Sequence, residues 1–201
     1  MQRRVGNAAA ATLNLAGKTD TAATPSALGS EADLEKRLAG ANPTERARLM
    51  AGLGLVRLDR QLPVGVFHGS PARGSAMFTG GKSAIDLVGL DETGALWLFE
   101  LKTAQNIKAG ALFYTMVMHD VRQGRIAFDQ LAGPRSTIMP AQIIAAPRIH
   151  ARLLADASHP LLSAAVFEVP TRAVAERGWP LDFGFHKLGA CLNRTGEGQA
   201  V

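Results

Sequence analysis

The stretch that decides the fold is "GGKSAIDLVGLDETGALWLFELKTAQN", residues Gly80–Asn106. Within it, the runs "SAIDLVGL" (83–90) and "ALWLFELK" (95–102) are short, mostly apolar and bounded by turn residues, which is typical of buried strands. The segment "DETG" (91–94) joins them. The stretch therefore predicts a tight antiparallel hairpin near the centre of a sheet.

The loop of this hairpin predicts which residues face one another. A three-residue loop, Glu92–Gly94, places a glycine where a type I turn followed by a G1 bulge requires positive φ. In that register Asp86 lies opposite Glu100. Because side chains alternate along a strand, Lys102 leaves the same face as both carboxylates. We therefore expect two carboxylates and one ammonium to meet at one end of the hairpin.

The burial of these polar groups is the reason to expect a metal ion. Apolar neighbours cover both faces of the two strands, so Asp86, Glu100 and Lys102 would leave water at a large cost in free energy. A cation between the two carboxylates offsets that cost. Hard oxygen ligands without Cys or His favour Mg²⁺ or Mn²⁺. The alternative that needs no metal is an ion pair between Lys102 and one carboxylate.

The "GGKS" segment (80–83) also suggests the end of a phosphate-binding loop. That motif requires a first glycine at position 76, where this chain has Ala76, and a helix directly after the loop. Here a strand follows, so no helix N-terminus would face a phosphate. The phosphate-loop interpretation is therefore rejected.

The remaining pattern predicts a mixed α/β (α+β) fold. The predicted helices cover 29–40, 42–55, 106–123 and 148–156, and the other predicted strands cover 56–67, 141–147, 164–170 and 182–188. Pro63 indicates that the strand over 56–67 is an edge strand or carries a bulge. The order α-β-β-β-α-β, then further helices and strands, predicts a mixed central sheet flanked by helices on both faces.

Composition limits the domain organisation and the environment. A chain of 201 residues with 47% apolar residues supports one domain, predicted over 30–193, with a flexible Ala/Thr-rich leader (1–29) and a short tail (194–201). The single cysteine, Cys191, excludes a disulfide framework and fits a reducing cytoplasm. No apolar run is long enough to span a bilayer, so we expect a cytoplasmic protein without a membrane partner. The net charge of +5 permits a polyanionic partner.

At the acidic hairpin the chain resembles the PD-(D/E)XK nuclease superfamily, here with Ile85-Asp86 and Glu100-Leu101-Lys102. The resemblance covers about residues 30–123 and is strongest to the RecB-type nuclease domain of the NucS group. It implies a restriction-endonuclease-like core and a metal-dependent phosphodiesterase. In that scheme Asp86, Glu100 and the Leu101 carbonyl hold Mg²⁺ or Mn²⁺, and Lys102 orients or deprotonates the attacking water.

The resemblance also implies accessory residues on the flanking helices. A glutamate of the first helix often completes such a site; Glu31 is the first choice and Glu35 the substitute, although either acid could equally face solvent at a helix N-terminus. The helix after the hairpin often carries Gln-x-x-x-Tyr. This chain has Tyr114 but Gly110 at the glutamine position, so Gln105 or Asn106 would have to substitute, and Tyr114 is otherwise a core aromatic.

The expected partner is nucleic acid, DNA ahead of RNA. The candidate DNA-binding residues lie in basic loops on either side of the hairpin, with solvated loop positions as the equal alternative: His68, Arg73, Lys82 and Lys108. A homodimer is the assembly to consider, because nucleases that cut both strands commonly dimerise. The function expected is a metal-dependent DNA endonuclease of repair, recombination or defence. Two alternatives remain open: a nuclease-fold module that binds DNA or protein without cleavage, and a structural protein with an incidental Glu-x-Lys triplet.

Overall fold

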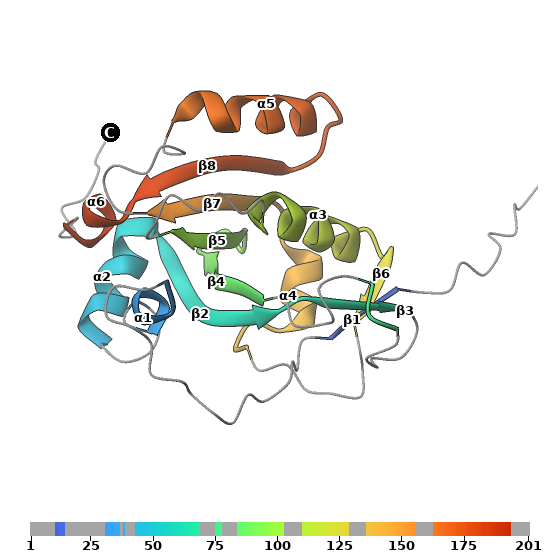
Figure 1. Ribbon diagram of the computed structural model, residues 1–201, viewed down its shortest axis with the longest axis horizontal. Helices are drawn as coiled ribbons and strands as arrows, with labels where there is room; N and C mark the ends of the chain where they lie inside the picture. The colour runs from blue at the N-terminus through green and yellow to red at the C-terminus, as the bar shows by residue number, and fades with distance from the viewer. Residues whose placement is uncertain are drawn as a thin grey trace, which may run out of the picture.

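The protein has a mixed α/β fold built on a five-stranded sheet (Figure 1). The computed structural model describes residues 11–14, 31–36, 38, 43–68, 75–77, 84–102, 110–128, 136–155 and 163–193. The strands of the main sheet, in spatial order, are β2 (Leu55–Pro63), β4 (Ala84–Asp91), β5 (Leu96–Lys102), β7 (Ile149–Ala155) and β8 (Leu181–Lys187). Strands β2, β4 and β5 pair antiparallel, whereas β5, β7 and β8 pair parallel. The predicted mixed sheet is therefore present, and β2, which contains Pro63, is an edge strand as expected.

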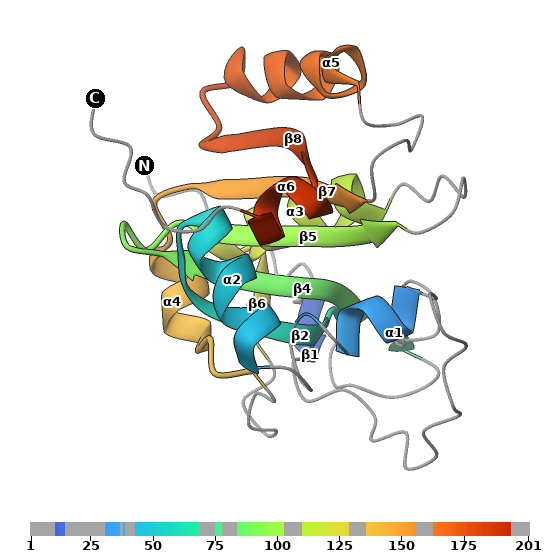
Figure 2. The same ribbon diagram turned by 90° about the vertical axis from the view of Figure 1, so that its left-hand side faces the viewer.

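Helices cover both faces of this sheet (Figures 1 and 2). One face carries α1 (Glu31–Lys36), α2 (Pro43–Leu53) and α6 (Leu188–Asn193); the other carries α3 (Gly110–Arg122) and α4 (Pro140–Ala145). Helix α5 (Ala164–Ala175) packs against the edge strand β8. A smaller sheet consists of β3 (Gly65–His68), β1 (Ala11–Asn14) and β6 (Ile126–Phe128). Among the helices of the described residues, none has the length and apolar character needed to cross a membrane.

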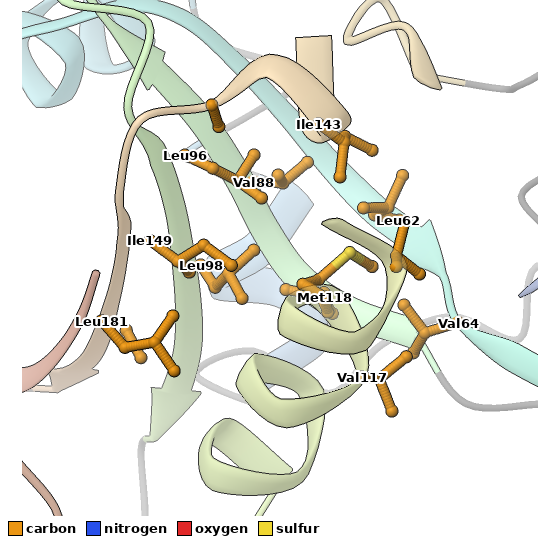
Figure 3. Packing of buried hydrophobic residues seen from close by; sticks show 14 of the residues in the cluster. Leu62, Val64, Val88, Leu96, Leu98, Val117, Met118, Ile143, Ile149 and Leu181 are labelled. Atoms are coloured by element: carbon orange, nitrogen blue, oxygen red, sulfur yellow. The ribbon is translucent and has the colours of Figure 1, made fainter. Parts of the chain in front are cut away.

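Each face of the sheet has its own apolar core. Figure 3 shows the core on the α3 side, where Val88, Leu96 and Leu98 meet Val117 and Met118. On the opposite face, another set of buried side chains packs against α1, α2 and α6: Leu34, Leu49, Leu58, Leu87, Phe99, Leu101 and Leu188. Burying one such leucine stabilises the fold by about 1.5–3 kcal/mol. Strands β4 and β5 are thus buried on both sides, as their continuous apolar runs predicted.

The β4–β5 hairpin has the predicted register. Its residue pairs run from Leu87 opposite Phe99 to Leu90 opposite Leu96, and Gly94 has φ of 77° in the three-residue loop. The side chain of Asp91 holds this loop, because it accepts hydrogen bonds from the backbone N–H groups of Thr93 (2.9 Å) and Ala95 (3.0 Å) and from Trp97 Nε1 (2.9 Å). Partial burial opposes ionisation of Asp91, but these donors outweigh it and hold the pKa of Asp91 below its usual value.

Three elements after the hairpin differ from their predictions. The segment 141–147, predicted as a strand, belongs to helix α4, which starts with Pro140 at its first turn and with Gln142 Oε1 accepting from the N–H of Met139 at 2.9 Å. The segment 148–156, predicted as a helix, contains the central strand β7 between β5 and β8. The segment 164–170, predicted as a strand, starts helix α5.

The predicted leader is also wrong in part. Ala11–Asn14 form strand β1, which pairs antiparallel with β3 and parallel with β6. Leu13 is fully buried in the core on the α3 side, and that burial is the reason for this strand to pair. The rest of the leader and the tail 194–201 lie outside the described residues.

Candidate functional site

The candidate site lies where β4 and β5 separate. One step beyond the last ladder pair, Leu87–Phe99, the register sets Asp86 opposite Glu100, as predicted. The carboxylate of Asp86, however, accepts a hydrogen bond from the backbone N–H of Leu101 at 2.8 Å. Its side chain therefore reaches across to the backbone of β5. This contact places the Asp86 carboxylate at the peptide group between Glu100 and Leu101.

Glu100 and Lys102 form a buried ion pair. Their side chains are 9% and 3% exposed, and Lys102 Nζ lies 2.9 Å from Glu100 Oε1. The same ammonium donates to the backbone carbonyl oxygen of Leu101 at 2.8 Å. Both backbone polar groups of Leu101 are thus hydrogen-bonded to side chains: its N–H to Asp86 and its carbonyl oxygen to Lys102. The ammonium contacts two of the three oxygens that were expected to bind a metal.

The first residue of α3 provides the space for the Glu100 carboxylate. A Cβ atom on Gly110 would lie 2.9 Å from both carboxylate oxygens, closer than real Cβ contacts. The carboxylate therefore sits against the N-terminus of a 13-residue helix, where the helix dipole favours negative charge. This contact is a reason for the glycine at position 110, since a side chain there would displace Glu100.

Helix α1 contributes Glu35 to the same region. Glu35 is 6% exposed, and its Oε2 accepts a hydrogen bond from Gln61 Nε2 at 3.2 Å. Burial raises the pKa of Glu35 from 4.5 to about 7; the Gln61 hydrogen bond opposes this rise and the nearby charge of Asp86 adds to it. Gln61 stands opposite Asp86 in the β2–β4 register, so its hydrogen bond draws Glu35 toward Asp86. Glu31, the first choice from the sequence, begins α1, and its side chain is outside those described.

The raised pKa of Glu35 predicts how stability depends on pH. The folded protein binds a proton at Glu35 more tightly than the unfolded chain does, so this group makes the folded state less stable as pH rises from about 4.5 to about 7. We expect Glu35→Gln to remove this slope and to raise the free energy of unfolding at pH 8 by about 3 kcal/mol. Urea unfolding of both proteins between pH 4.5 and pH 8.5 measures the effect. Parallel curves for wild type and variant across that range would contradict it.

The other predicted residues lie apart from this cluster or outside the described ranges. His68 is exposed at the end of β3, in the smaller sheet. Tyr114 is partly buried on α3, packs against the core and meets the ring of Phe113 edge-on at 5.5 Å. The remaining predicted residues fall outside the described ranges: Arg73, Lys82, Gln105, Asn106 and Lys108.

The donor atoms fit a hard divalent cation in type. Glu35, Asp86 and Glu100 offer carboxylate oxygens, and Glu35 Oε1 is buried without a hydrogen-bond partner among the described residues. Within the same ranges, no three His, Cys, Asp or Glu side chains are grouped closely enough to hold a metal ion. Magnesium commonly binds one or two carboxylates and keeps several waters. Two carboxylates such as Asp86 and Glu100 therefore match the ligands that it usually takes from a protein.

Sequence reasoning missed two residues of this region and one polar cluster. Gln61 and Gly110 carry no motif, because their roles depend on contacts with Glu35 and Glu100 from distant elements. The cluster joins β7 to β8: Asp182 accepts from His150 Nδ1 at 2.7 Å and pairs with Arg152. Burial opposes the ionisation of Asp182, but these two partners lower its pKa to about 2. The cluster thus holds charged residues in place within the sheet.

Comparison of the chain with known protein families, with curated proteins and with solved structures finds no match.

Proposed function

We propose that this chain is a metal-dependent nuclease of the PD-(D/E)XK kind that hydrolyses phosphodiester bonds of DNA. The observation that carries the proposal is the meeting of Asp86, Glu100 and Lys102 around the Leu101 peptide at the end of a central hairpin. The restriction-endonuclease-like core would consist of α1, β2, β4, β5, α3 and β7, which occur in the expected order of types, with α2, β3, β6 and α4 inserted between them. The net charge of +5 suits a polyanionic substrate.

The balance of charge in the site supports a divalent cofactor. Glu35, Asp86 and Glu100 bring three carboxylates, whereas Lys102 and Arg60, whose charge acts on Glu35, bring two cations, which leaves one excess negative charge when all are ionised. Glu35 and Glu100 are less than a tenth exposed, so water does little to stabilise that excess. A divalent cation supplies the missing charge, and carboxylate oxygens are the ligands that Mg²⁺ and Mn²⁺ prefer.

Each side chain then has a definite role. Asp86 and Glu100, with the Leu101 carbonyl, would hold Mg²⁺ or Mn²⁺, and the buried Glu35 would add negative charge nearby. When bound, the ion would lower the pKa of a coordinated water and neutralise charge on the phosphate. Lys102 would turn its ammonium from the Leu101 carbonyl toward the attacking water and orient it, or would take the water's proton as the neutral amine.

Removing the Asp86 carboxylate tests the proposal. We expect Asp86→Ala to lower cleavage of plasmid or branched DNA in Mg²⁺ or Mn²⁺ by at least about a hundredfold, because it removes a metal ligand worth several kcal/mol in the transition state. Asp120→Ala is the matched control, since Asp120 lies near the far end of α3 and pairs with Arg125 on the surface. Cleavage without a metal ion, or full activity of Asp86→Ala, would contradict the mechanism.

A second function is favoured by the position of Lys102. Its ammonium already lies between Glu100 Oε1 and the Leu101 carbonyl oxygen, where it supplies one positive charge in place of a metal ion. A nuclease-fold module that binds DNA or protein without cleaving it would keep this arrangement permanently. In that case wild type and Asp86→Ala would bind DNA equally with or without Mg²⁺, and neither would cut it.

A further inference from the structure

Gln61 on β2 has an unusual backbone conformation. Its φ is 52°, and among the described residues it is the one non-glycine position with positive φ. The other four such positions in those ranges are glycines: Gly54, Gly94, Gly124 and Gly178. The left-handed region disfavours residues with a Cβ, and such strained residues cluster at functional sites. The chain therefore keeps a glutamine where glycine would satisfy the backbone better.

This conformation reverses the alternation of side chains along β2. Leu58 packs in the core with α1 and α2, whereas Leu62 packs in the core with α3. Residues four apart in a regular strand leave the same face, so the reversal occurs between them. Strand β4 shows the same reversal: Leu87 and Ile85, two apart, lie in different cores.

The two reversals face each other across the sheet. Arg60 pairs with Leu87, and Leu62 pairs with Ile85, so the register sets Gln61 opposite Asp86. Asp86 is also the point where the hairpin opens and the carboxylate reaches the N–H of Leu101. The strained residue on the edge strand thus adjoins the acidic residue on which the candidate site depends.

The side chain of Gln61 binds Glu35, a buried carboxylate of helix α1. Its Nε2 donates to Glu35 Oε2 at 3.2 Å, from an exposed position on β2 to a buried position on α1. The other oxygen, Oε1, has no hydrogen-bond partner within the described ranges. Gln61 therefore fixes one oxygen of Glu35 and leaves the second for another ligand.

We propose that Gln61 is a positioning residue of the candidate site, whose strained backbone and side-chain amide together hold the Glu35 carboxylate beside Asp86. The role of Glu35 in catalysis rests on the proposed function. The contact between Gln61 and Glu35 can be tested without DNA or metal. Glycine at this position would relieve the backbone and lose the amide. Asparagine would tolerate the left-handed conformation and keep a shorter amide.

The test compares Gln61→Gly and Gln61→Asn with wild type. For Gln61→Gly we expect a urea midpoint equal to or above that of wild type, together with Mn²⁺ binding and DNA cleavage weakened about tenfold or more. We expect Gln61→Asn to bind Mn²⁺ and to cleave DNA better than Gln61→Gly does, but less well than wild type. A merely structural residue would give the opposite result, a lower urea midpoint with Mn²⁺ affinity and cleavage unchanged, and that outcome would overturn the proposal.

A metal-free measurement separates this proposal from the proposed function. The NMR signals of the Gln61 side-chain amide in the full chain are expected to move strongly in Glu35→Ala and little in the surface control Glu168→Ala, whose carboxylate is 70% exposed. If wild type neither binds Mn²⁺ nor cleaves DNA, the nuclease function fails, while the amide signals still report whether Gln61 holds Glu35. If the amide signals do not move in Glu35→Ala, Gln61 does not position Glu35, whether or not the protein cleaves DNA.

Discussion

Replacing Lys102 with methionine is expected to lower the free energy of unfolding at pH 7 by about 3–5 kcal/mol, because it leaves a buried charge without its partner. Methionine keeps most of the volume of the lysine stem, so packing changes little. Glu100 is 8% exposed and would lose the ammonium that lies 2.9 Å from its Oε1. Urea or thermal unfolding of the metal-free proteins measures the loss.

The same variant should lose activity if the proposed function is correct. We expect cleavage of DNA to fall by about 10²- to 10⁴-fold, since Lys102 is assigned to the attacking water. Mn²⁺ should stabilise Lys102→Met more than wild type, because the metal no longer competes with an ammonium for Glu100 and the Leu101 carbonyl.

The double variant Lys102→Met/Glu100→Gln is the control for stability. It removes both charges, and we expect it to recover most of the stability lost in the single variant, as replacement of a whole buried pair often does. A double variant that is as unstable as Lys102→Met would show that the loss comes from packing. A single variant as stable as wild type would contradict the buried ion pair itself.

Replacing Gly52 with alanine is expected to release helix α6 from the body of the protein. The new Cβ would lie 2.1 Å from the backbone oxygen of Cys191 and 2.9 Å from its carbonyl carbon, and backbone atoms cannot turn aside as a side chain can. Helix α6 must shift, which exposes Leu188 and Cys191, each now 4% exposed. The expected loss in the free energy of unfolding is about 3 kcal/mol.

Cys191 offers a direct measure of that movement, because it is the only cysteine in the chain. Its thiol should react slowly with an aromatic disulfide reagent in wild type and much faster in Gly52→Ala. Gly189→Ala on the same helix is the matched control: nothing lies within 4 Å of its added Cβ, and alanine favours a helix by up to about 1 kcal/mol over glycine. If the thiol of Gly52→Ala reacts as slowly as that of wild type, the backbones of α2 and α6 do not lie as close together as the structure has them.

Local chemistry was enough to predict the hairpin. The loop residues 92–94, with glycine last, fit one turn geometry, and that geometry fixes the register of β4 on β5. Continuous apolar runs then predicted burial on both faces. The edge position of β2 followed from Pro63 in the same local way, because a proline lacks the N–H that a central strand needs.

The region 141–175 could not be predicted in the same way, because its elements depend on distant partners. Strand β7 carries His150 and Arg152, which favoured a helix in the sequence; their partner Asp182 lies on β8, 32 and 30 residues away. Helix α5 has apolar residues typical of a strand, and Val166 and Val169 remain exposed on it. It packs against β8 instead, where Thr171 Oγ1 accepts a hydrogen bond from the N–H of Phe183 at 3.1 Å, and this contact joins residues twelve apart in the chain.

The sequence by itself determined the hairpin, its register and the identity of Asp86, Glu100 and Lys102 as candidates, because turn geometry and strand alternation act within a few residues. Only the tertiary structure decided that Asp86 turns to the Leu101 backbone, that Glu35 comes beside it and that Gly110 makes room for Glu100. These placements depend on a reversal at Gln61 and on two helices that pack from opposite faces. Such contacts join residues far apart in the chain, and no local pattern encodes them.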